Sequence, residues 1–213
     1  MLLLLIIIYI VLKVSINNGS FYVSIKDNDQ LESGMAVYES QKDPTPKREL
    51  VAENLQFMDN ISIKWLPENI HNEAEGSHNG NNYIAYTFYV ENQSDNIFNY
   101  WYEIYIDDVI KNVDDAVRIR VYKNGEATTY AKVSAKGTLD VAADKNFLEE
   151  NYVMEDHVED FKPGDVDRYT VVMWLEGNDP ECNDNILGGE FKAHMQFNSE
   201  HVDYEEGEND EKE

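Results

Sequence analysis

The chain is poor in cysteine and in positive charge. Its single cysteine, Cys182, rules out an internal disulfide bond. Lys and Arg number 17 against 42 Asp and Glu, which gives a net charge of −25. A chain this acidic repels phosphate backbones and anionic lipid headgroups. We therefore expect no nucleic-acid partner, and no membrane contact through the charged part of the chain.

Long apolar runs are also missing, apart from one at the start, residues 1–12 (MLLLLIIIYIVL). A helix that spans a bilayer needs about 20 apolar residues, and Lys13 follows this run at once. Its length suits the apolar region of a signal peptide, although a basic segment before it and an A-x-A site after it are absent. Residues 1–16 are predicted to be a signal peptide or the remnant of a membrane anchor, with a buried core strand as the alternative.

Export and the lack of disulfides together favour a secreted or cell-surface location in a bacterium, because small eukaryotic secreted domains usually carry several disulfides. Only residues 1–16 are then expected to touch a membrane. Residues 17–50 are predicted to be a short N-terminal strand followed by a linker, residues 51–198 a β-sandwich domain, and residues 199–213 a disordered acidic tail. The tail has too little apolar surface to offset its ordering entropy.

The sequence has little helical periodicity, and alternation of apolar and polar residues dominates. It is clearest in residues 83–90 and 98–106 and recurs in residues 117–121, 168–176 and 190–197. Aromatic residues make up 12% of the chain, 14 of them Tyr, and they favour strands. Asn124-Gly125 indicates a tight hairpin, because both turn positions favour positive φ. The pattern predicts an all-β fold, an antiparallel β-sandwich with a jelly-roll or immunoglobulin-like layout.

Several of these strands and turns carry a recognisable arrangement after the apolar start: YVENQS at 89–94, FKPGD at 161–165 leading into YTVVMW at 169–174, and GGEF at 188–191. Over roughly residues 51–197 the chain resembles the TasA/camelysin group of surface proteins from Gram-positive bacteria. The resemblance implies a secreted jelly-roll-like sandwich. Some members form extracellular-matrix fibres, in which an N-terminal segment of one subunit adds as a strand to the next, and others are described as surface metallo-endopeptidases.

For strand addition, the candidate here is Phe21–Ile25, whose apolar residues Phe21, Val23 and Ile25 alternate with polar ones. An added strand supplies backbone hydrogen bonds to an open sheet edge. The alternatives are that this strand pairs within its own domain or is an unpaired stalk. The expected partners are further copies of the chain or other surface proteins.

The peptidase hypothesis requires zinc ligands, and the H-E-x-x-H motif is absent. The nearest cluster, His71, Glu73, Glu75 and His78, lies in a Gly- and Asn-rich loop that is poorly suited to fixing ligand geometry. The sequence therefore offers no catalytic signature and no required cofactor. Calcium accepts 6–8 oxygen ligands in flexible geometry, so the acidic loop with Asp179, Glu181 and Asp184 is a candidate calcium site, and ordinary acidic loops are the alternative.

Aromatic residues alternate onto both faces of the two clearest strands. If those strands form a hairpin with Val90 opposite Tyr100, then Tyr89, Trp101 and Tyr105 share one face. An exposed aromatic surface of this kind suits a polysaccharide or a partner subunit, whereas burial of both faces is the alternative. The sequence thus predicts an exported protein that acts by protein–protein association. A metallo-endopeptidase and a carbohydrate-binding module are the other hypotheses.

Overall fold

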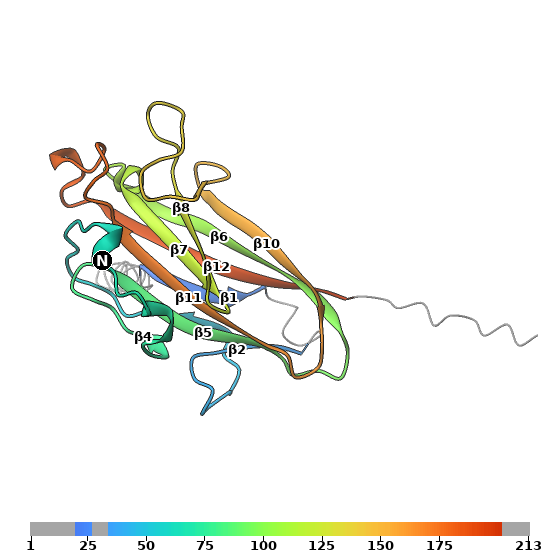
Figure 1. Ribbon diagram of the computed structural model, residues 1–213. Coiled ribbons are helices and arrows are strands. Elements are labelled where there is room, and N and C mark those ends of the chain that lie inside the picture. The colour runs from blue at the N-terminus through green and yellow to red at the C-terminus, as the bar shows by residue number, and fades with distance from the viewer. Residues whose placement is uncertain (1–19, 27–33, 202–213) are drawn as a thin grey trace, which may run out of the picture.

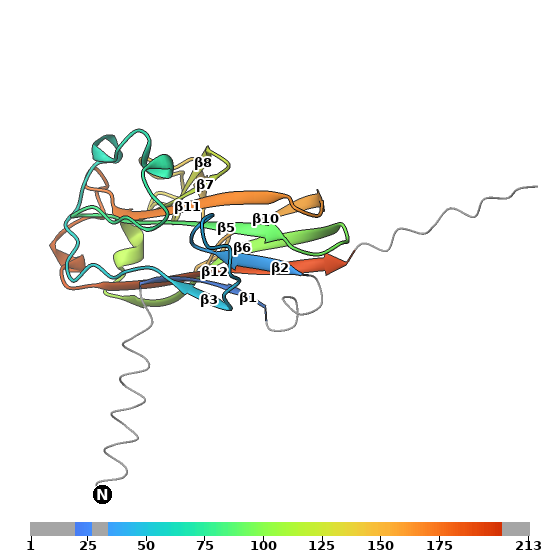
Figure 2. The same ribbon diagram turned by 90° about the horizontal axis from the view of Figure 1, so that it is seen from below.

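The computed structural model describes residues 20–26 and 34–201, whereas residues 1–19, 27–33 and 202–213 lie outside this description (Figure 1). Two sheets pack face to face, with β12, β1 and β3 on one side of the molecule and β11 and β7 on the other (Figure 2). Sheet A has the order β10-β6-β12-β1-β3, and sheet B has the order β2-β5-β11-β7-β8-β9, with β4 paired to β5.

The strands of the described residues are β1 (Phe21–Ile25), β2 (Met35–Tyr38), β3 (Glu49–Val51), β4 (Gly76–Ser77), β5 (Ile84–Asn92), β6 (Phe98–Ile110), β7 (Val117–Lys123), β8 (Glu126–Ala131), β9 (Lys145–Asn146), β10 (Tyr152–Phe161), β11 (Val166–Leu175) and β12 (Glu190–His201). The helices in the same ranges are four short 3-10 turns: η1 (Ile63–Trp65), η2 (Ile70–Asn72), η3 (Val113–Asp115) and η4 (Asp184–Ile186). The prediction of an all-β sandwich is therefore confirmed.

Both sheets are mixed rather than purely antiparallel. β1 runs parallel to β12, with Phe21 opposite Ala193 and Ile25 opposite Phe197, and the short β9 runs parallel to β8. The other pairings are antiparallel, including the β7–β8 hairpin. At its turn, Asn124 has φ 51° and Gly125 has φ 93°, as the hairpin prediction requires.

The core lies between the sheets and is rich in aromatic rings. Alternate residues of β6 and β12 point inward, and Tyr100, Ile104, Met195 and Phe197 are fully buried. Burial of the Tyr100 hydroxyl is offset by hydrogen bonds, because it donates to the Asp167 carboxylate and lies 2.8 Å from the Tyr169 hydroxyl. The sequence pattern thus produces a buried aromatic layer with a small polar centre whose groups are hydrogen-bonded.

The structure corrects the expected linker in residues 17–50. β1, β2 and β3 all belong to the sandwich, β1 and β3 in sheet A and β2 in sheet B. β1 is expected as a strand from its alternation. β2, with four residues that are all buried, and β3, with three residues, carry no alternation long enough to distinguish them from loop. At the other end β12 continues to His201. The predicted signal or anchor segment and the acidic tail from residue 202 on lie outside the described residues.

The hairpin expected between residues 83–90 and 98–106 is wrong. β5 pairs with β11, β2 and β4 in sheet B, and β6 pairs with β10 and β12 in sheet A. The turn between them therefore crosses from one sheet to the other. Asn92 holds this crossing, since its Nδ2 donates to the carbonyls of Asn96 and Phe161 and its Oδ1 accepts from the Ser94 amide.

Candidate functional site

The predicted interaction residues of β1 are core residues in this structure. Phe21 and Val23 are fully buried and Ile25 is nearly so. Their strand is hydrogen-bonded on both sides, to β12 in parallel and to β3 in antiparallel orientation. Of the alternatives left open by the sequence, the structure has the strand paired within its own domain.

The aromatic residues predicted to share one face are divided between the sheets. Tyr89 lies on β5 in sheet B and is 3% exposed. Its ring stacks on Tyr38 at 5.6 Å, and its hydroxyl donates to Glu75 Oε1 at 2.9 Å. Trp101 and Tyr105 lie on the outer face of sheet A, where Trp101 stacks on His157 at 4.6 Å. Tyr89 therefore contributes to no common surface with them.

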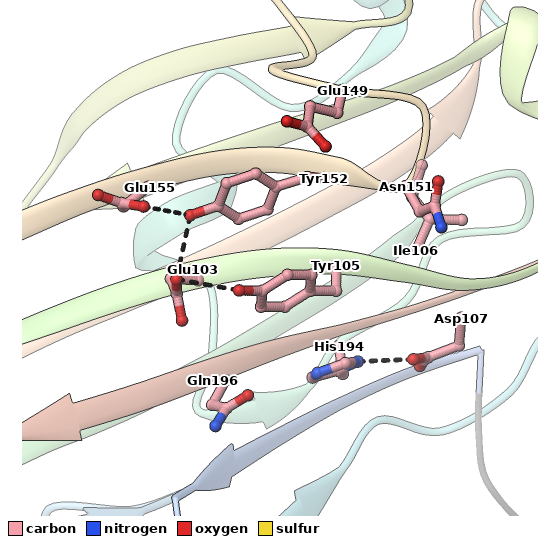
Figure 3. A pocket seen from close by; sticks show the side chains of 10 residues that line it. All are labelled: Glu103, Tyr105, Ile106, Asp107, Glu149, Asn151, Tyr152, Glu155, His194 and Gln196. Atoms are coloured by element: carbon pink, nitrogen blue, oxygen red, sulfur yellow. Dashed lines mark hydrogen bonds and ion pairs between the residues drawn. The ribbon is translucent and has the colours of Figure 1, made fainter.

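Four rings form a ladder across the outer face of sheet A, one each from β10, β6, β12 and β1: Tyr152, Tyr105, His194 and Tyr22. Successive ring centroids are 4.8, 5.4 and 4.9 Å apart, with interplanar angles of 18°, 23° and 12°. Three of these rings, Tyr152, Tyr105 and His194, line a shallow pocket of about 720 Å³ (Figure 3). Because the rings stack on one another, their faces are largely occupied within the sheet and offer no flat platform for a sugar.

Carboxylates accompany the ring ladder. Glu103 Oε1 accepts hydrogen bonds of 3.0 Å from the hydroxyls of both Tyr105 and Tyr152, and His194 Nδ1 lies 2.8 Å from Asp107 Oδ1 (Figure 3). Burial, followed by hydrogen bonds to carboxylates, raises the pKa of both tyrosines. They therefore remain protonated donors at neutral pH. The pocket is polar and acidic, and it holds no nucleophile with an adjacent base.

The candidate zinc cluster is dispersed. His71 stacks on Tyr122 at 4.8 Å, and His78 Nε2 is 2.9 Å from Thr87 Oγ1. Glu75 binds the hydroxyls of Ser40 and Tyr89. His71, His78 and Glu75 each have a structural partner, and burial lowers the pKa of His78, which keeps the ring neutral. In residues 20–26 and 34–201, no histidine belongs to a group of side chains with metal-binding geometry.

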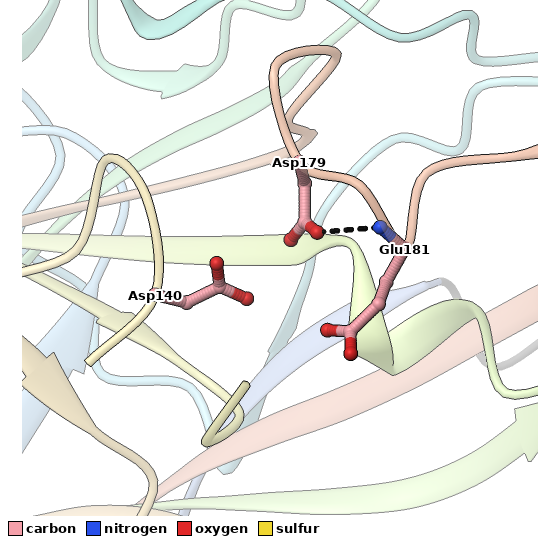
Figure 4. Close-up of side chains that lie close together, drawn as sticks. All are labelled: Asp140, Asp179 and Glu181. Atoms are coloured by element: carbon pink, nitrogen blue, oxygen red, sulfur yellow. Dashed lines mark hydrogen bonds between the residues drawn. The ribbon is translucent and has the colours of Figure 1, made fainter. Parts of the chain in front are cut away.

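An acidic triad does exist, and it could hold a metal ion. It consists of Asp140, Asp179 and Glu181, whose candidate ligand atoms lie within 4.8 Å of one another. Figure 4 shows the three carboxylates, Asp140 from one loop and the other two from the loop after β11. Two of the three predicted calcium ligands are therefore present. The third, Asp184, lies exposed in the first turn of η4 and does not join them.

Arg118 of β7 lies beneath this acidic triad. Its side chain is fully buried, and Nη2 is 2.6 Å from Asp179 Oδ2 and 3.3 Å from Asp140 Oδ2. Its Nε donates to the carbonyl of Val141 at 2.8 Å. Burial is the main cause of a raised pKa at Asp140, and the neighbouring Asp179 adds to it. The alternation in residues 117–121 places Arg118 away from the core, but nothing local in the sequence shows that two distant loops cover it or that Asp140 joins the loop of Asp179.

Cys182 lies beside the acidic triad. Burial raises the pKa of its thiol, and the carboxylate of Asp179 raises it further. A thiol in this environment is a weak nucleophile. The structure thus provides no activated cysteine.

Comparison with known proteins finds little. No family model matches the chain, and no curated protein matches it. Two crystal structures of the β-glucosidase from Kluyveromyces marxianus, one of them with glucose bound, show 14% and 13% identity and TM-scores of 0.25 and 0.26. They cover 58% and 79% of this chain, which spans only 12% and 15% of theirs. TM-scores this low support no argument about fold or function. In the described residues, no helix is long and apolar enough to span a membrane.

Proposed function

We propose that this chain is an exported bacterial protein of the cell surface or extracellular matrix, that it acts by protein–protein association, and that copies assemble into fibres by exchanging β1. The observation that carries the proposal is the position of β1. β1 has five residues and lies between β12 and β3 in sheet A. In the sequence it is far from β12.

The contacts of β1 explain why its exchange between copies of the chain is energetically feasible. Phe21 and Val23 fill fully buried sites, and the backbone is bonded at both ends, from Ala193 N to Ser20 O and from Lys26 N to Phe197 O, each at 3.0 Å. The same pockets and hydrogen bonds are satisfied whether β1 comes from its own chain or from a second copy. Exchange therefore loses no contact, and the slot between β12 and β3 cannot stay empty without exposing the core.

A peptidase is a weaker proposal, because the group with metal-binding geometry in the described residues has only carboxylate ligands. Zinc prefers His and Cys, whereas calcium takes carboxylate oxygens. A polysaccharide-binding module is also weaker, since the rings of sheet A are stacked on one another.

Strand exchange can be tested by cysteine cross-linking in a Cys182→Ser background. Ser24 on β1 is in register with Gln196 on β12, so the double variant S24C/Q196C places two thiols within disulfide reach. If copies exchange β1, oxidation of the full chain gives a ladder of disulfide-linked oligomers on a non-reducing gel. Electron microscopy of the same sample then shows filaments.

The matched control is E103C/Q196C, because Glu103 of β6 is the register partner of Gln196 within one chain. This pair should give cross-linked monomers only. Absence of filaments, together with monomers alone from both pairs, would refute assembly by strand exchange. Export is tested separately: deletion of residues 1–16 should retain the chain inside a bacterial host, and equal secretion of both forms would contradict it.

A further inference from the structure

The acidic triad joins two loops that are distant in sequence. Asp140 lies between β8 and β9, and Asp179 and Glu181 lie between β11 and η4. The Ala135 amide of the first loop donates to Glu181 Oε1 of the second at 2.9 Å, which joins the two loops. Within the first loop, the Val141 amide donates to Asp140 Oδ1 at 2.7 Å. The Glu181 amide donates to Asp179 Oδ1 at 2.8 Å (Figure 4). These bonds aim the carboxylates at a common space.

A second observation points to a bound cation. The Asp140 side chain is only 6% exposed, yet its Oδ2 is buried and accepts no hydrogen bond. Arg118 Nη2 is the ion-pair partner of this oxygen at 3.3 Å, while its short hydrogen bond of 2.6 Å goes to Asp179. Two of the three carboxylates, Asp140 and Asp179, thus share one guanidinium, and Glu181 lies within 4.8 Å of them. The group therefore carries more negative than positive charge in a largely buried site. Buried charge of this kind needs a counter-charge.

We propose that Asp140, Asp179 and Glu181 bind one Ca²⁺ ion, which clasps the loop of Asp140 to the loop of Asp179. Calcium fits because it accepts carboxylate oxygens in flexible geometry and completes its shell of 6–8 ligands with carbonyls and water. Magnesium demands a tighter octahedral arrangement and gives up its waters reluctantly. The ion supplies the charge that Arg118 alone does not, and Arg118 remains paired with Asp179 at the edge of the site.

The test uses the full chain, freed of metal with a chelator, and measures Tm with 10 mM CaCl₂ or 10 mM MgCl₂. For a Kd on the order of 10⁻⁴–10⁻³ M, as in extracellular calcium modules, calcium should raise Tm by about 3–10 °C. Magnesium should raise it by less. Asp140→Asn should lose the calcium response. Asp184→Asn is the matched control, since Asp184 is an exposed carboxylate at the start of η4, next to that loop and outside the acidic triad, and it should keep the response.

Proteolysis gives a second measurement that does not depend on Tm. Lys136 is exposed in the loop of Asp140, so calcium should slow tryptic cleavage there at least tenfold in the unaltered chain and not in Asp140→Asn. Two results would overturn the proposal: no calcium effect on either measurement, or an equal effect in Asp140→Asn, which would indicate diffuse binding to the acidic surface. Either result leaves strand exchange untouched, because the cross-linking pairs do not involve the triad.

Discussion

Replacing Phe21 by alanine tests whether β1 belongs to the core of the folded protein. The Phe21 side chain is fully buried, and its ring meets the ring of Tyr86 edge to face, with centroids 6.4 Å apart. Since Tyr86 lies on β5 of sheet B, Phe21 joins the two layers of the sandwich. Tyr22, the next residue, points to the outer face and stacks on His194 at 4.9 Å. Phe21→Ala and Tyr22→Ala therefore probe opposite faces of one strand.

The expected losses differ clearly. Removing a buried Phe side chain lowers the free energy of unfolding by about 3–5 kcal/mol, through lost transfer energy and the cavity that remains. Tyr22→Ala loses one partly exposed stacking contact, at about 0.5–1.5 kcal/mol. For a domain of this size, about 2–4 °C of Tm corresponds to 1 kcal/mol. Phe21→Ala should thus lower Tm by about 6–20 °C and Tyr22→Ala by about 1–6 °C.

The assay is urea unfolding of both variants, followed by tryptophan fluorescence, to which the buried Trp174 contributes, with thermal melts in parallel. An unchanged slope of unfolding free energy against urea would show that the variants unfold as the unaltered chain does. The reasoning is refuted if Phe21→Ala changes stability by less than 1 kcal/mol, or by no more than Tyr22→Ala. The Phe21 side chain would then not be packed between the two sheets, in its own chain or in a neighbour.

Two further changes probe other parts of the sandwich. Burial alone would raise the pKa of Glu39, but hydrogen bonds of 2.6 Å from Lys47 and 2.7 Å from the Tyr86 hydroxyl lower it below its usual 4.5. This carboxylate therefore contributes stability above pH 4.5 that is lost as the pH falls through its folded pKa. The Tm difference between the unaltered chain and Glu39→Gln should shrink below pH 4, and a constant difference from pH 7 to pH 3 would contradict this. At the start of β12, a Cβ on Gly189 would lie 2.7 Å from the carbonyl oxygen of Ile110. Gly189→Ala should therefore destabilise the protein by about 1–3 kcal/mol in urea unfolding, and a change under 0.5 kcal/mol would show that the backbone yields freely there.

Local patterns in the sequence predict several of the strands and one turn, but not β2, β3 or β10. Alternation in residues 98–106 and 190–197 corresponds to β6 and β12, and Asn124-Gly125 forms the expected hairpin with both φ angles positive. Side-chain period and turn chemistry are local properties, so they can be read without knowledge of the fold. Pairing partners are not local, and for this reason the hairpin expected between β5 and β6 is wrong.

The candidate site shows the same division. Asp179 and Glu181 lie in one acidic loop and are visible together in the sequence, whereas Asp140 and Arg118 join them only because two loops fold over β7. Likewise, Phe21, Val23 and Ile25 reveal a strand, but only the sheet shows that it lies between β12 and β3.

The sequence by itself determined the class of fold, because apolar residues alternate with a period of two and helical periodicity is scarce. Both features favour strands, which pair into sheets. The tertiary structure alone decided which strands are neighbours, which aromatic faces are covered and which carboxylates meet. Those outcomes depend on contacts between residues far apart in the chain, and such contacts follow from the packing of one apolar face against another rather than from any local sequence signal.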